Sequence, residues 1–244
     1  MMKPNLEIKL LKNQEISCAK EFTILCWNVA KLTNDSIFIN YLEKVIKDEK
    51  IDILLLQEFK KSITKEIKIG DYSYVLSPNM ETKKNIFGVL SAFKIHCEDN
   101  LALLSKRREF RYLTHKSSLI TTHKLNNSQK LLIVHVHAIN FVKNSDFYNE
   151  IDYIKTNILS HKGAMILAGD FNTWNSKRSA YLREMTNELS LKEIIFEDDK
   201  HRKKFFTQHL DHIFYRGFNL LEAKVLNSKN ISDHNPIIAK LAII

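Results

Sequence analysis

The sequence predicts an α/β fold in which two mixed β-sheets stack on each other and helices cover them from outside. Short apolar runs that suit buried strands outnumber segments with helical spacing, and the two kinds alternate only in part. A barrel would need a helix after every strand, so stacked sheets fit better. No repeat, low-complexity tract or flexible linker divides the 244 residues. We therefore expect an arm or edge strand over residues 1–21 and one domain over residues 22–244.

The first part of the chain predicts a crossover unit of strand, helix and strand. Residues 22–29 form an apolar run that fits a buried strand. Residues 34–35 are a plausible helix N-cap, and apolar residues then recur at helical spacing to about residue 47. Residues 51–56 fit a second buried strand, which we expect to end at residues 57–58. This order favours two strands of one sheet joined across a helix.

Most of the remaining segments also predict strands. Residues 131–137 alternate between two faces, and Ser145 can cap a following helix that reaches Ile158. Pro78-Asn79 and Gly88 are expected to interrupt the chain between short strands. The other expected strands cover residues 72–76, 86–90, 164–168, 210–215, 223–226 and 237–243, with a strand pair within residues 110–125 and a last helix carrying residues 181–189.

The composition suits a protein with an anionic partner in a reducing compartment. Lys and Arg outnumber Asp and Glu by 37 to 28, which gives a net charge of +9 and favours nucleic acid, phosphorylated metabolites or anionic lipids. A generally basic surface is the alternative. No signal peptide or membrane-spanning segment is visible, so we expect a cytoplasmic protein. The cysteines lack the number and spacing of a disulfide framework or a zinc ribbon; they are Cys18, Cys26 and Cys97.

One stretch, residues 166–174, joins a small apolar strand to polar groups. Gly169 is expected to let the backbone leave the sheet without a Cβ clash, and Asp170 and Asn172 follow it. Alone, these two residues could be turn formers. Polar groups also stand at five other strand ends or adjoining loops, which packing does not require unless they converge on a site. The six positions are Asn28, Glu58, His137, Asp170 with Asn172, Asp211, and Asp233 with His234.

Six motifs around these residues together resemble the endonuclease/exonuclease/phosphatase superfamily, which has the DNase I-like fold. A closer likeness, to the bacterial YafD-like branch, rests on residues 137–141, 169–174 and 214–217. The resemblance implies a four-layer α/β sandwich and Mg²⁺-dependent hydrolysis of phosphodiesters or phosphomonoesters. Because every core position of the family pattern is present, we expect an active enzyme. The motifs are Leu25-Cys-Trp-Asn28, Leu56-Gln-Glu58, His135-Val-His-Ala138, Gly169-Asp-Phe-Asn172, Leu210-Asp-His-Ile-Phe214 and Ser232-Asp-His-Asn-Pro236.

Several of these side chains suit a magnesium site. Mg²⁺ prefers oxygen ligands and keeps several waters, so one or two carboxylates and a substrate phosphate suffice to hold it. Glu58 is the first choice as direct ligand, and Asp233 and Asn28 are further or water-mediated ligands. A surface acid after a strand is the alternative for Glu58. We expect Mn²⁺ to substitute for Mg²⁺.

Hydrolysis also needs an oriented water and compensation for charge on the phosphoryl oxygens. Asp170 is placed to orient or deprotonate the water, and Asn172 to donate to a nonbridging oxygen. The resemblance implies that His234 pairs with Asp211, which would fix its tautomer and favour the imidazolium. Whether His234 is a base or a cationic phosphate clamp stays open.

Further residues are candidates for substrate contact. His137 is a candidate phosphate contact or leaving-group acid, whereas His135 on the same strand face fits a packed histidine better. Lys116 stands where relatives often have a phosphate-binding residue, with a solvated lysine as the alternative, and Trp174 is another substrate-binding candidate. Two basic runs could follow a phosphate backbone, although charge runs are more often solvated faces. The runs are Lys106 to Arg108 with Arg111, and Lys200 to Lys204 followed by Phe205 and Phe206.

A nuclease acting on DNA or RNA is the leading interpretation, because of the +9 charge and the aromatic residues beside a basic run. The alternative is a phosphodiesterase or phosphatase acting on lipids or small molecules, similar to sphingomyelinases or inositol phosphatases. The inositol phosphatase signatures are absent, and no strongly apolar surface hairpin is evident. A catalytically silent binding scaffold is a further alternative, against which the intact acids and histidines argue. We expect a monomer.

Overall fold

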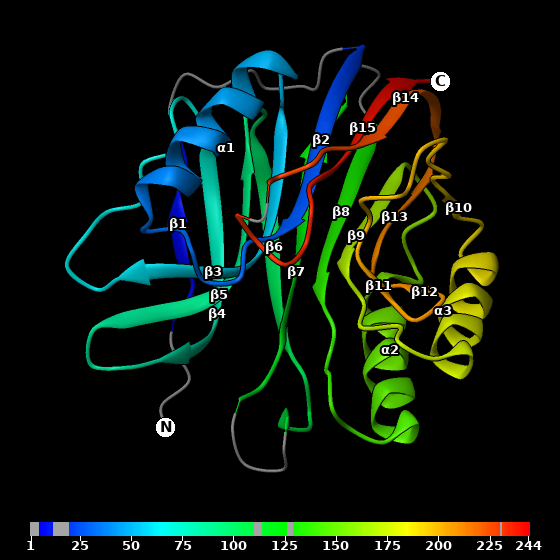
Figure 1. Ribbon diagram of the computed structural model, residues 1–244. Helices are drawn as coiled ribbons and strands as arrows, with labels where there is room; N and C mark the ends of the chain where they lie inside the picture. Colours follow the sequence, from blue (N-terminus) through cyan, green and yellow to red (C-terminus); the bar gives the residue numbers. More distant parts are fainter. Residues whose placement is uncertain (1–4, 12–19, 110–113, 126–128, 230) are drawn as a thin grey trace.

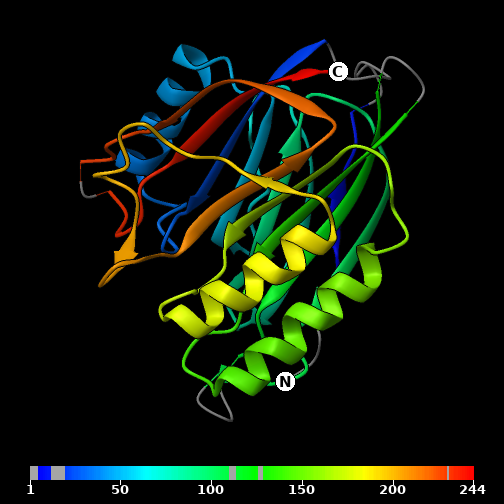
Figure 2. The same cartoon turned by 90° about the vertical axis from the view of Figure 1, so that its right-hand side faces the viewer.

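Two β-sheets stack face to face, and helices cover both outer faces, so that the protein has four layers (Figure 1). The computed structural model describes residues 5–11, 20–109, 114–125, 129–229 and 231–244. Helix α1 (Ser36–Asp48) lies on one side, and helices α2 (Asn144–Ile158) and α3 (Ser176–Glu188) lie together on the other (Figure 2). The expected pair of mixed sheets with outer helices is confirmed.

The larger sheet has seven strands in the order β1-β4-β5-β3-β2-β15-β14. β2 and β3 are parallel and joined through α1, as the predicted crossover unit requires. β1 pairs with β4 at the edge of the sheet. The strands are β1 (Glu7–Lys9), β2 (Glu21–Asn28), β3 (Ile53–Ser62), β4 (Ser73–Glu81), β5 (Asn85–Phe93), β14 (Phe218–Val225) and β15 (Ile237–Ile243). Cys18 lies outside the described residues.

The smaller sheet has six strands in the order β10-β13-β9-β8-β7-β6. β8 and β9 are parallel and joined through α2, and β13 runs antiparallel to β9. The strands are β6 (Cys97–Leu104), β7 (Ser117–Lys124), β8 (Lys130–His137), β9 (Met165–Asp170), β10 (Lys192–Glu193) and β13 (Asp211–Arg216). A separate hairpin consists of β11 (Lys204–Phe205) and β12 (Gln208–His209).

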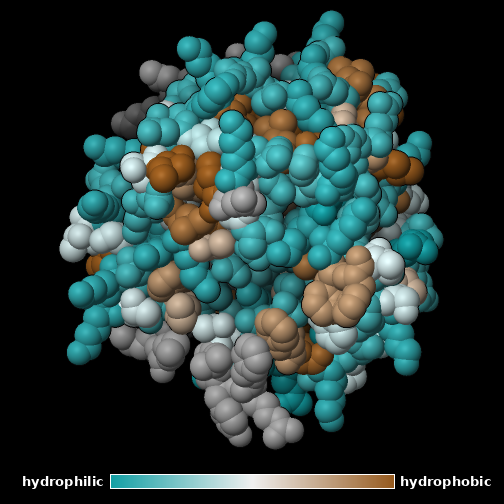
Figure 3. Space-filling model, viewed as in Figure 1, coloured by the Kyte–Doolittle hydropathy of each residue, from teal (hydrophilic) through white to brown (hydrophobic). Residues whose placement is uncertain are grey.

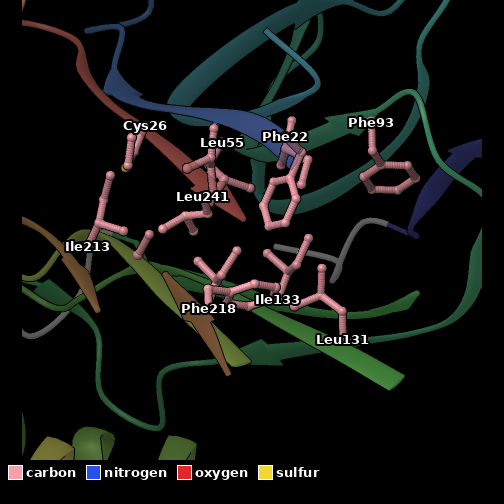
Figure 4. Close-up of a cluster of buried hydrophobic side chains, with 14 of the residues drawn as sticks. Phe22, Cys26, Leu55, Phe93, Leu131, Ile133, Ile213, Phe218 and Leu241 are labelled. Atoms are coloured by element: carbon pink, nitrogen blue, oxygen red, sulfur yellow. The ribbon is translucent and has the colours of Figure 1, made fainter. Parts of the chain in front are cut away.

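The main hydrophobic core lies between the two sheets. Phe22 and Leu55 of one sheet meet Ile133 of the other there (Figure 4). The opposite face of β8 turns Val134 and Val136 toward α2 and α3, so the predicted alternation of this strand is confirmed. Each large apolar side chain that is fully buried stabilises the fold by about 1.5–3 kcal/mol. The core therefore fixes the position of one sheet relative to the other, including the strand ends that carry the polar residues.

Helix α1 begins where the sequence indicates. The side chain of Asp35 accepts a hydrogen bond from the amide of Ile37 at 2.7 Å, which caps the helix. Phe38 and Leu42 are buried on the face that packs against the larger sheet. Helix α2 begins earlier than expected, at Asn144, and Ser145 lies inside its first turn rather than at the cap.

Pro78 and Gly88 do not separate strands, because β4 and β5 run through them and pair there. A Cβ on Gly88 would lie 2.2 Å from the carbonyl oxygen of Ser77, so glycine allows the two backbones to approach. The register shifts between Pro78 and Met80, which places the proline at a bulge. Both residues therefore serve strand pairing rather than chain reversal.

The prediction of a strand pair within residues 110–125 is also wrong. That segment contributes β7, which pairs with β6 at residues 97–104 and with β8, while residues 110–113 lie outside the described part of the chain. β6 was not predicted because it is an edge strand with acidic and exposed positions, so it lacks the apolar run of a buried strand.

Contrary to expectation, Gly169 does not mark the point where the backbone leaves the sheet, because β9 continues past it to Asp170. A Cβ at this position would lie 1.8 Å from the carbonyl oxygen of Val136, and the φ of Gly169 is 151°. The absence of a side chain thus allows β8 and β9 to lie side by side at their carboxyl ends.

We expect Gly169→Ala to lower the free energy of unfolding by about 3 kcal/mol or more, because the new methyl group would force the two strands apart. For a chain of this size, that loss corresponds to a fall in Tm of roughly 6–12 °C. Thermal and urea denaturation measure it. Gly70→Ala is the matched control, since Gly70 has a φ of +40° but open space around it. Equal losses in the two variants would contradict the steric explanation.

Hydrophilic residues cover most of the face seen in Figure 3. Of the helices in the described segments, none combines the length and the apolar character needed to cross a membrane.

Candidate active site

Polar strand ends meet at one end of the two stacked sheets. β8 and β9 finish side by side, with His137 opposite Asp170, and β13 begins with Asp211 on the other side of Asp170. The larger sheet contributes Asn28 at the end of β2, whose Nδ2 donates to Oδ2 of Asp170 at 3.0 Å. The carboxyl ends of parallel strands are frequent places for ligand sites in α/β proteins.

Glu58 reaches this site from a bulge rather than from a strand end. β3 continues to Ser62, and its register with β5 shifts between Leu56 and Phe59. Glu58 has a φ of 53°, a left-handed conformation that costs about 1–3 kcal/mol and is frequent at functional sites. Its Oε1 lies 3.9 Å from Nε2 of His137. The bulge turns the carboxylate toward the other sheet.

His234 and Asp211 form a buried ion pair. Nδ1 of His234 lies 3.0 and 2.8 Å from the two carboxylate oxygens of Asp211, as the family resemblance implies. The indole of Trp27 donates to the carbonyl oxygen of His234 at 2.9 Å, which holds the loop in place. Burial disfavours the imidazolium, but the carboxylates of Asp211 and Asp170 outweigh it and raise the pKa of His234 to about 9. His234 is therefore a cation at neutral pH.

Asp170 lies at the centre of the group. Its Oδ1 accepts from the amide of Asn172 at 3.0 Å, and its Oδ2 lies 3.8 Å from Nε2 of His137 and 3.9 Å from Nε2 of His234. Burial raises the pKa of Asp170 to about 6, with the charge of Asp211 acting in the same direction and His234 opposing it. A carboxylate with this pKa is ionised at neutral pH and is more basic than an exposed one.

Asn172 links the loops that follow β8 and β9. Its Nδ2 donates to the carbonyl oxygen of Ala138 at 2.8 Å, and its φ is 50°. Because an amide group carries two hydrogens, this bond leaves one donor for another acceptor. Part of the side chain is thus used to hold the loops together.

Lys116 is buried, so a solvated surface lysine is the wrong interpretation for it. Only 8% of the residue is exposed, and Nζ lies 2.9 Å from Nε2 of His137 and 3.7 Å from Oε1 of Glu58. Burial, followed by the charge of Lys116, lowers the pKa of His137 well below its usual value. His137 is then neutral and accepts from Lys116, which opposes the expected alternative of a leaving-group acid.

A group of three residues and, separately, Glu58 offer ligands for a metal ion. Ligand atoms of Asp170, Asp211 and His234 all lie within 4.8 Å of one another. A metal bound there would have to displace the proton on Nε2 of His234, because Nδ1 already bonds to Asp211 and the ring is cationic at neutral pH. Glu58, with 23% of its side chain exposed, offers carboxylate oxygens that solvent can reach.

His135 is a packed histidine, as predicted. Its Nε2 lies 2.6 Å from Nε2 of Gln57, and its Nδ1 lies 3.0 Å from the hydroxyl of Ser91. The amide of Gln57 must donate, so the proton of the ring is on Nδ1. Burial lowers the pKa of His135 to about 3, and the ring is neutral. These two hydrogen bonds connect the smaller sheet to the larger one, at the residue that precedes Glu58.

Arg178 is a central residue that the sequence does not reveal. Its guanidinium donates to the carbonyl oxygens of Ile139 and Asn172, both at 3.1 Å. It lies 4.6 Å from the ring centroids of Phe147 and Trp174, and the residue is fully buried. An arginine in the first turn of a helix normally indicates a solvent-exposed position. Here it holds together the two loops that follow β8 and β9.

The basic run from Lys200 to Lys204 is mostly neutralised. Arg202 is buried, and it donates to the carbonyl oxygen of Asp211 at 2.8 Å and to Glu193 at 3.2 Å. The lysines form ion pairs, which are Lys200 with Asp198, Lys203 with Asp233 and Lys204 with Asp199. The structure therefore uses this run for internal contacts, which does not favour a path for a phosphate backbone.

The other basic run is engaged in a similar way. Nζ of Lys106 lies 5.2 Å from the ring centroid of Tyr153, and Nε of Arg107 lies 3.4 Å from Asp146. Nε of Arg108 donates to His115 at 3.1 Å. Arg111 lies outside the described residues.

Asp233 lies at the rim of the site rather than at its centre. Its side chain is 64% exposed, and its Oδ2 lies 3.0 Å from Nζ of Lys203. In this position it does not join the group formed by Asp170, Asp211 and His234. A role for Asp233 as a metal ligand stays a prediction.

Trp174 connects the site to an aromatic hairpin. Its ring lies 6.4 Å from that of Phe205, and its Nε1 is buried without a hydrogen-bond partner among the described residues. Phe205, the last residue of β11, is 48% exposed, and Phe206, at the turn before β12, is 88% exposed. The hydroxyl of Thr173 donates to the carbonyl oxygen of His209 at 2.6 Å, which ties the hairpin to the loop after β9. An exposed hairpin that carries two phenylalanines thus lies beside the site.

Comparison with known proteins agrees with this arrangement. A model of the Endonuclease/Exonuclease/phosphatase family matches residues 25–234. A UPF0294 protein of Erwinia tasmaniensis is 32% identical over 227 residues, which cover 90% of this chain and 81% of that protein. A UPF0294 protein of Yersinia pestis is 30% identical over 234 residues, covering 93% of this chain and 86% of its own length. The UPF0294 proteins are YafD-like, so the resemblance to this branch is confirmed.

Solved structures share the fold at low sequence identity. An endonuclease/exonuclease/phosphatase family protein from Leptotrichia buccalis has a TM-score of 0.70 and 20% identity, with 91% of this chain and 100% of that chain covered. The human Nocturnin catalytic domain with bound sulfate has a TM-score of 0.65 and 14% identity, with 94% and 97% covered. D. rerio TDP2 complexed with a single-strand DNA product has a TM-score of 0.61 and 13% identity, with 91% and 99% covered. The four-layer DNase I-like sandwich and the matched residues together place this chain in the endonuclease/exonuclease/phosphatase family.

Proposed function

We propose that this protein hydrolyses phosphodiester bonds in nucleic acid in a reaction that depends on Mg²⁺. The observation that carries the proposal is the buried Asp211–His234 pair beside Asp170, which faces the carboxylate of Glu58 across His137. Together these residues supply a base, a cation and a carboxylate within one site. Each of these groups can assist the hydrolysis of a phosphate ester.

The proton chemistry follows from the two raised pKa values. Asp170, with a pKa of about 6, is ionised at neutral pH and can take a proton from an attacking water. His234, with a pKa of about 9, keeps its proton and can donate from Nε2 to a phosphoryl oxygen. These values favour Asp170 as the base and His234 as the phosphate clamp. The ammonium group of Lys116 provides a second positive charge on the other side of Asp170.

The oxygen donors near Glu58 suit a hard cation. Glu58 would hold Mg²⁺ directly, and Asn28 would assist through Oδ1, which accepts one hydrogen bond from the amide of Ala30 and keeps a second lone pair. When bound, Mg²⁺ supplies Lewis-acid stabilisation of charge on the phosphate. Lys31 and Lys116 lie 3.4 and 3.7 Å from Glu58, so two ammonium groups face this carboxylate.

Nucleic acid is the substrate class that we favour. The net charge of +9 attracts a polyanion, and TDP2, which has the same fold, was solved with a single-strand DNA product. The ion-paired run from Lys200 to Lys204 does not add to this argument. Binding would then depend on the overall field and on contacts close to the site.

A lipid phosphodiesterase is the second candidate, because of the exposed aromatic hairpin. Phe206 is 88% exposed beside a site that would cleave a phosphate ester. Hydrophobic groups gather in Figure 3 at the position that Figure 1 gives to the β11–β12 hairpin. Exposed aromatic side chains can enter the interface of a lipid surface as well as stack on bases.

A substrate panel tests the proposal. It comprises plasmid, single-stranded DNA, RNA, bis(p-nitrophenyl) phosphate, an inositol polyphosphate and sphingomyelin vesicles, each with Mg²⁺, with Mn²⁺ and with EDTA. We expect cleavage of at least one nucleic acid with either metal ion and none in EDTA, because removal of the ion leaves the phosphate charge without its main compensation. Product analysis by gel and by phosphate release measures the result.

Each alternative has its own signature in the panel. Cleavage that continues in EDTA would exclude the metal-dependent mechanism. Cleavage of sphingomyelin with intact nucleic acids would move the assignment to the lipid candidate. Phe206→Ser would then be expected to lower vesicle binding, with Phe141→Ser, another exposed phenylalanine, as the matched control.

A further inference from the structure

A cavity of about 570 Å³ lies between α2, the segment after β6 and the segment after β8. Ser105 and Lys106 line it from one side, Ile139 from another, and Asn149, Glu150 and Tyr153 from α2. Its size is within the range of sites that hold a small organic group, about 300–1,000 Å³. We call it the α2 cavity.

The α2 cavity shares a wall with the active site. The hydroxyl of Ser105 accepts from the amide of Lys116 at 2.9 Å, and the side chain of Lys116 lies 2.9 Å from His137. Ile139 follows His137 by two residues and lines the cavity. A substrate group in the cavity would thus lie next to a phosphate held at Lys116.

The floor of the cavity carries a buried acid with a free oxygen. Glu150 is 6% exposed, and its Oε2 accepts from the amide of Ile139 at 2.7 Å. Within the described residues, no hydrogen bond reaches Oε1. Burial raises the pKa of Glu150 to about 8, against the effects of the Ile139 amide and Lys116, so the carboxyl group is mostly neutral at pH 7. A neutral carboxyl group can donate and accept at once.

The other walls suit a flat and uncharged ring. Tyr153 offers an aromatic ring, and Lys106 lies 5.2 Å from its centroid. Arg107 is paired with Asp146 at 3.4 Å, so this cation is compensated. Asp146 and Asp152 on α2 disfavour a phosphate here, and the charged and polar residues among the lining disfavour a long acyl chain. A nucleobase has the flat surface and the donor and acceptor edge that such a cavity can recognise.

We propose that the α2 cavity receives a nucleobase of the substrate, next to the phosphate that is cleaved. Glu150 would bond to the edge of the base, while Tyr153 would contact its ring. This inference rests on the proposed nuclease function, because it assigns the base-recognition site of that same reaction.

Nucleoside binding without metal tests the cavity independently of hydrolysis. Adenosine, guanosine, cytidine and uridine are titrated into the protein in EDTA and followed by NMR. We expect at least one to bind and to shift the resonances of Asn149 and Tyr153. Asn149→Trp should remove binding, because residue 149 is exposed at the cavity and a large side chain would fill its mouth. Ser160→Trp, at an exposed residue beyond the end of α2, is the matched control.

Steady-state kinetics provide the second readout. We expect Asn149→Trp to raise KM for a dinucleotide by about tenfold or more, as loss of one base contact implies, whereas Ser160→Trp should leave that KM unchanged. Absence of nucleoside binding, or equal binding to Asn149→Trp, would overturn the assignment. Nucleoside binding without hydrolysis of any phosphodiester would instead reject the proposed function and leave the cavity assignment standing.

Discussion

Asp170→Asn is expected to lower kcat by about 10²- to 10⁴-fold, as the loss of a general base does. The amide cannot accept a proton from water, although it keeps nearly the same size in a position that is 2% exposed. Steady-state hydrolysis of bis(p-nitrophenyl) phosphate measures the effect without any contribution from base recognition. Near-normal turnover would show that Asp170 is not the base.

The pH profile gives a second measure of the same residue. Asp170 has a pKa raised to about 6, and its active form is the ionised one, so kcat/KM should rise with pH up to about 6. Asp170→Asn should lose this acidic limb. Asp71→Asn is the matched control, because Asp71 is exposed at the far end of β4 and should keep both the rate and the profile.

His234→Ala is expected to lower kcat by about 10²- to 10³-fold, because it removes a cationic donor that would face the phosphoryl oxygens. The active form of His234 is the protonated one, and its pKa is raised to about 9, so the wild-type rate should fall as pH rises through 9. His234→Ala should lose this basic limb. His96→Ala is the matched control, since His96 precedes β6 at the end away from the site.

Asp211→Asn distinguishes a charge effect from a steric one. The amide oxygen can still accept from Nδ1 of His234, but it no longer supplies the negative charge that raises the pKa of His234. The basic limb should therefore move below pH 9 with the ring still in place. A basic limb that stays at the wild-type pH would contradict the ion-pair explanation for this histidine.

Much of the fold could be predicted because it depends on local patterns. The apolar runs predict β2, β8, β9 and the capped helix α1 to within a few residues. The failures have a common cause, because β6 and the bulge at Glu58 depend on pairing with another strand. Pairing between distant segments leaves only a weak signal in the order of residues.

The candidate site divides in the same way. Asn28, Glu58, His137, Asp170 and His234 could be selected because each polar residue follows or precedes an apolar run and matches a family motif. Arg178 could not be selected, because an arginine near the start of a helix has no mark of burial until two loops fold over it. From the sequence, Lys116 could be a phosphate-binding residue or a solvated lysine, and its burial against His137 excludes the solvated lysine.

Apolar periodicity and the order of the motifs were enough to predict the family, the stacked sheets and the candidate residues of the site, because both can be read before the chain folds. The charges of these residues could not be predicted in that way. Burial raises the pKa of Asp170, the neighbouring carboxylates raise that of His234, and burial beside Lys116 lowers that of His137. Protonation depends on distance and on solvent exclusion, and both are properties of the folded chain.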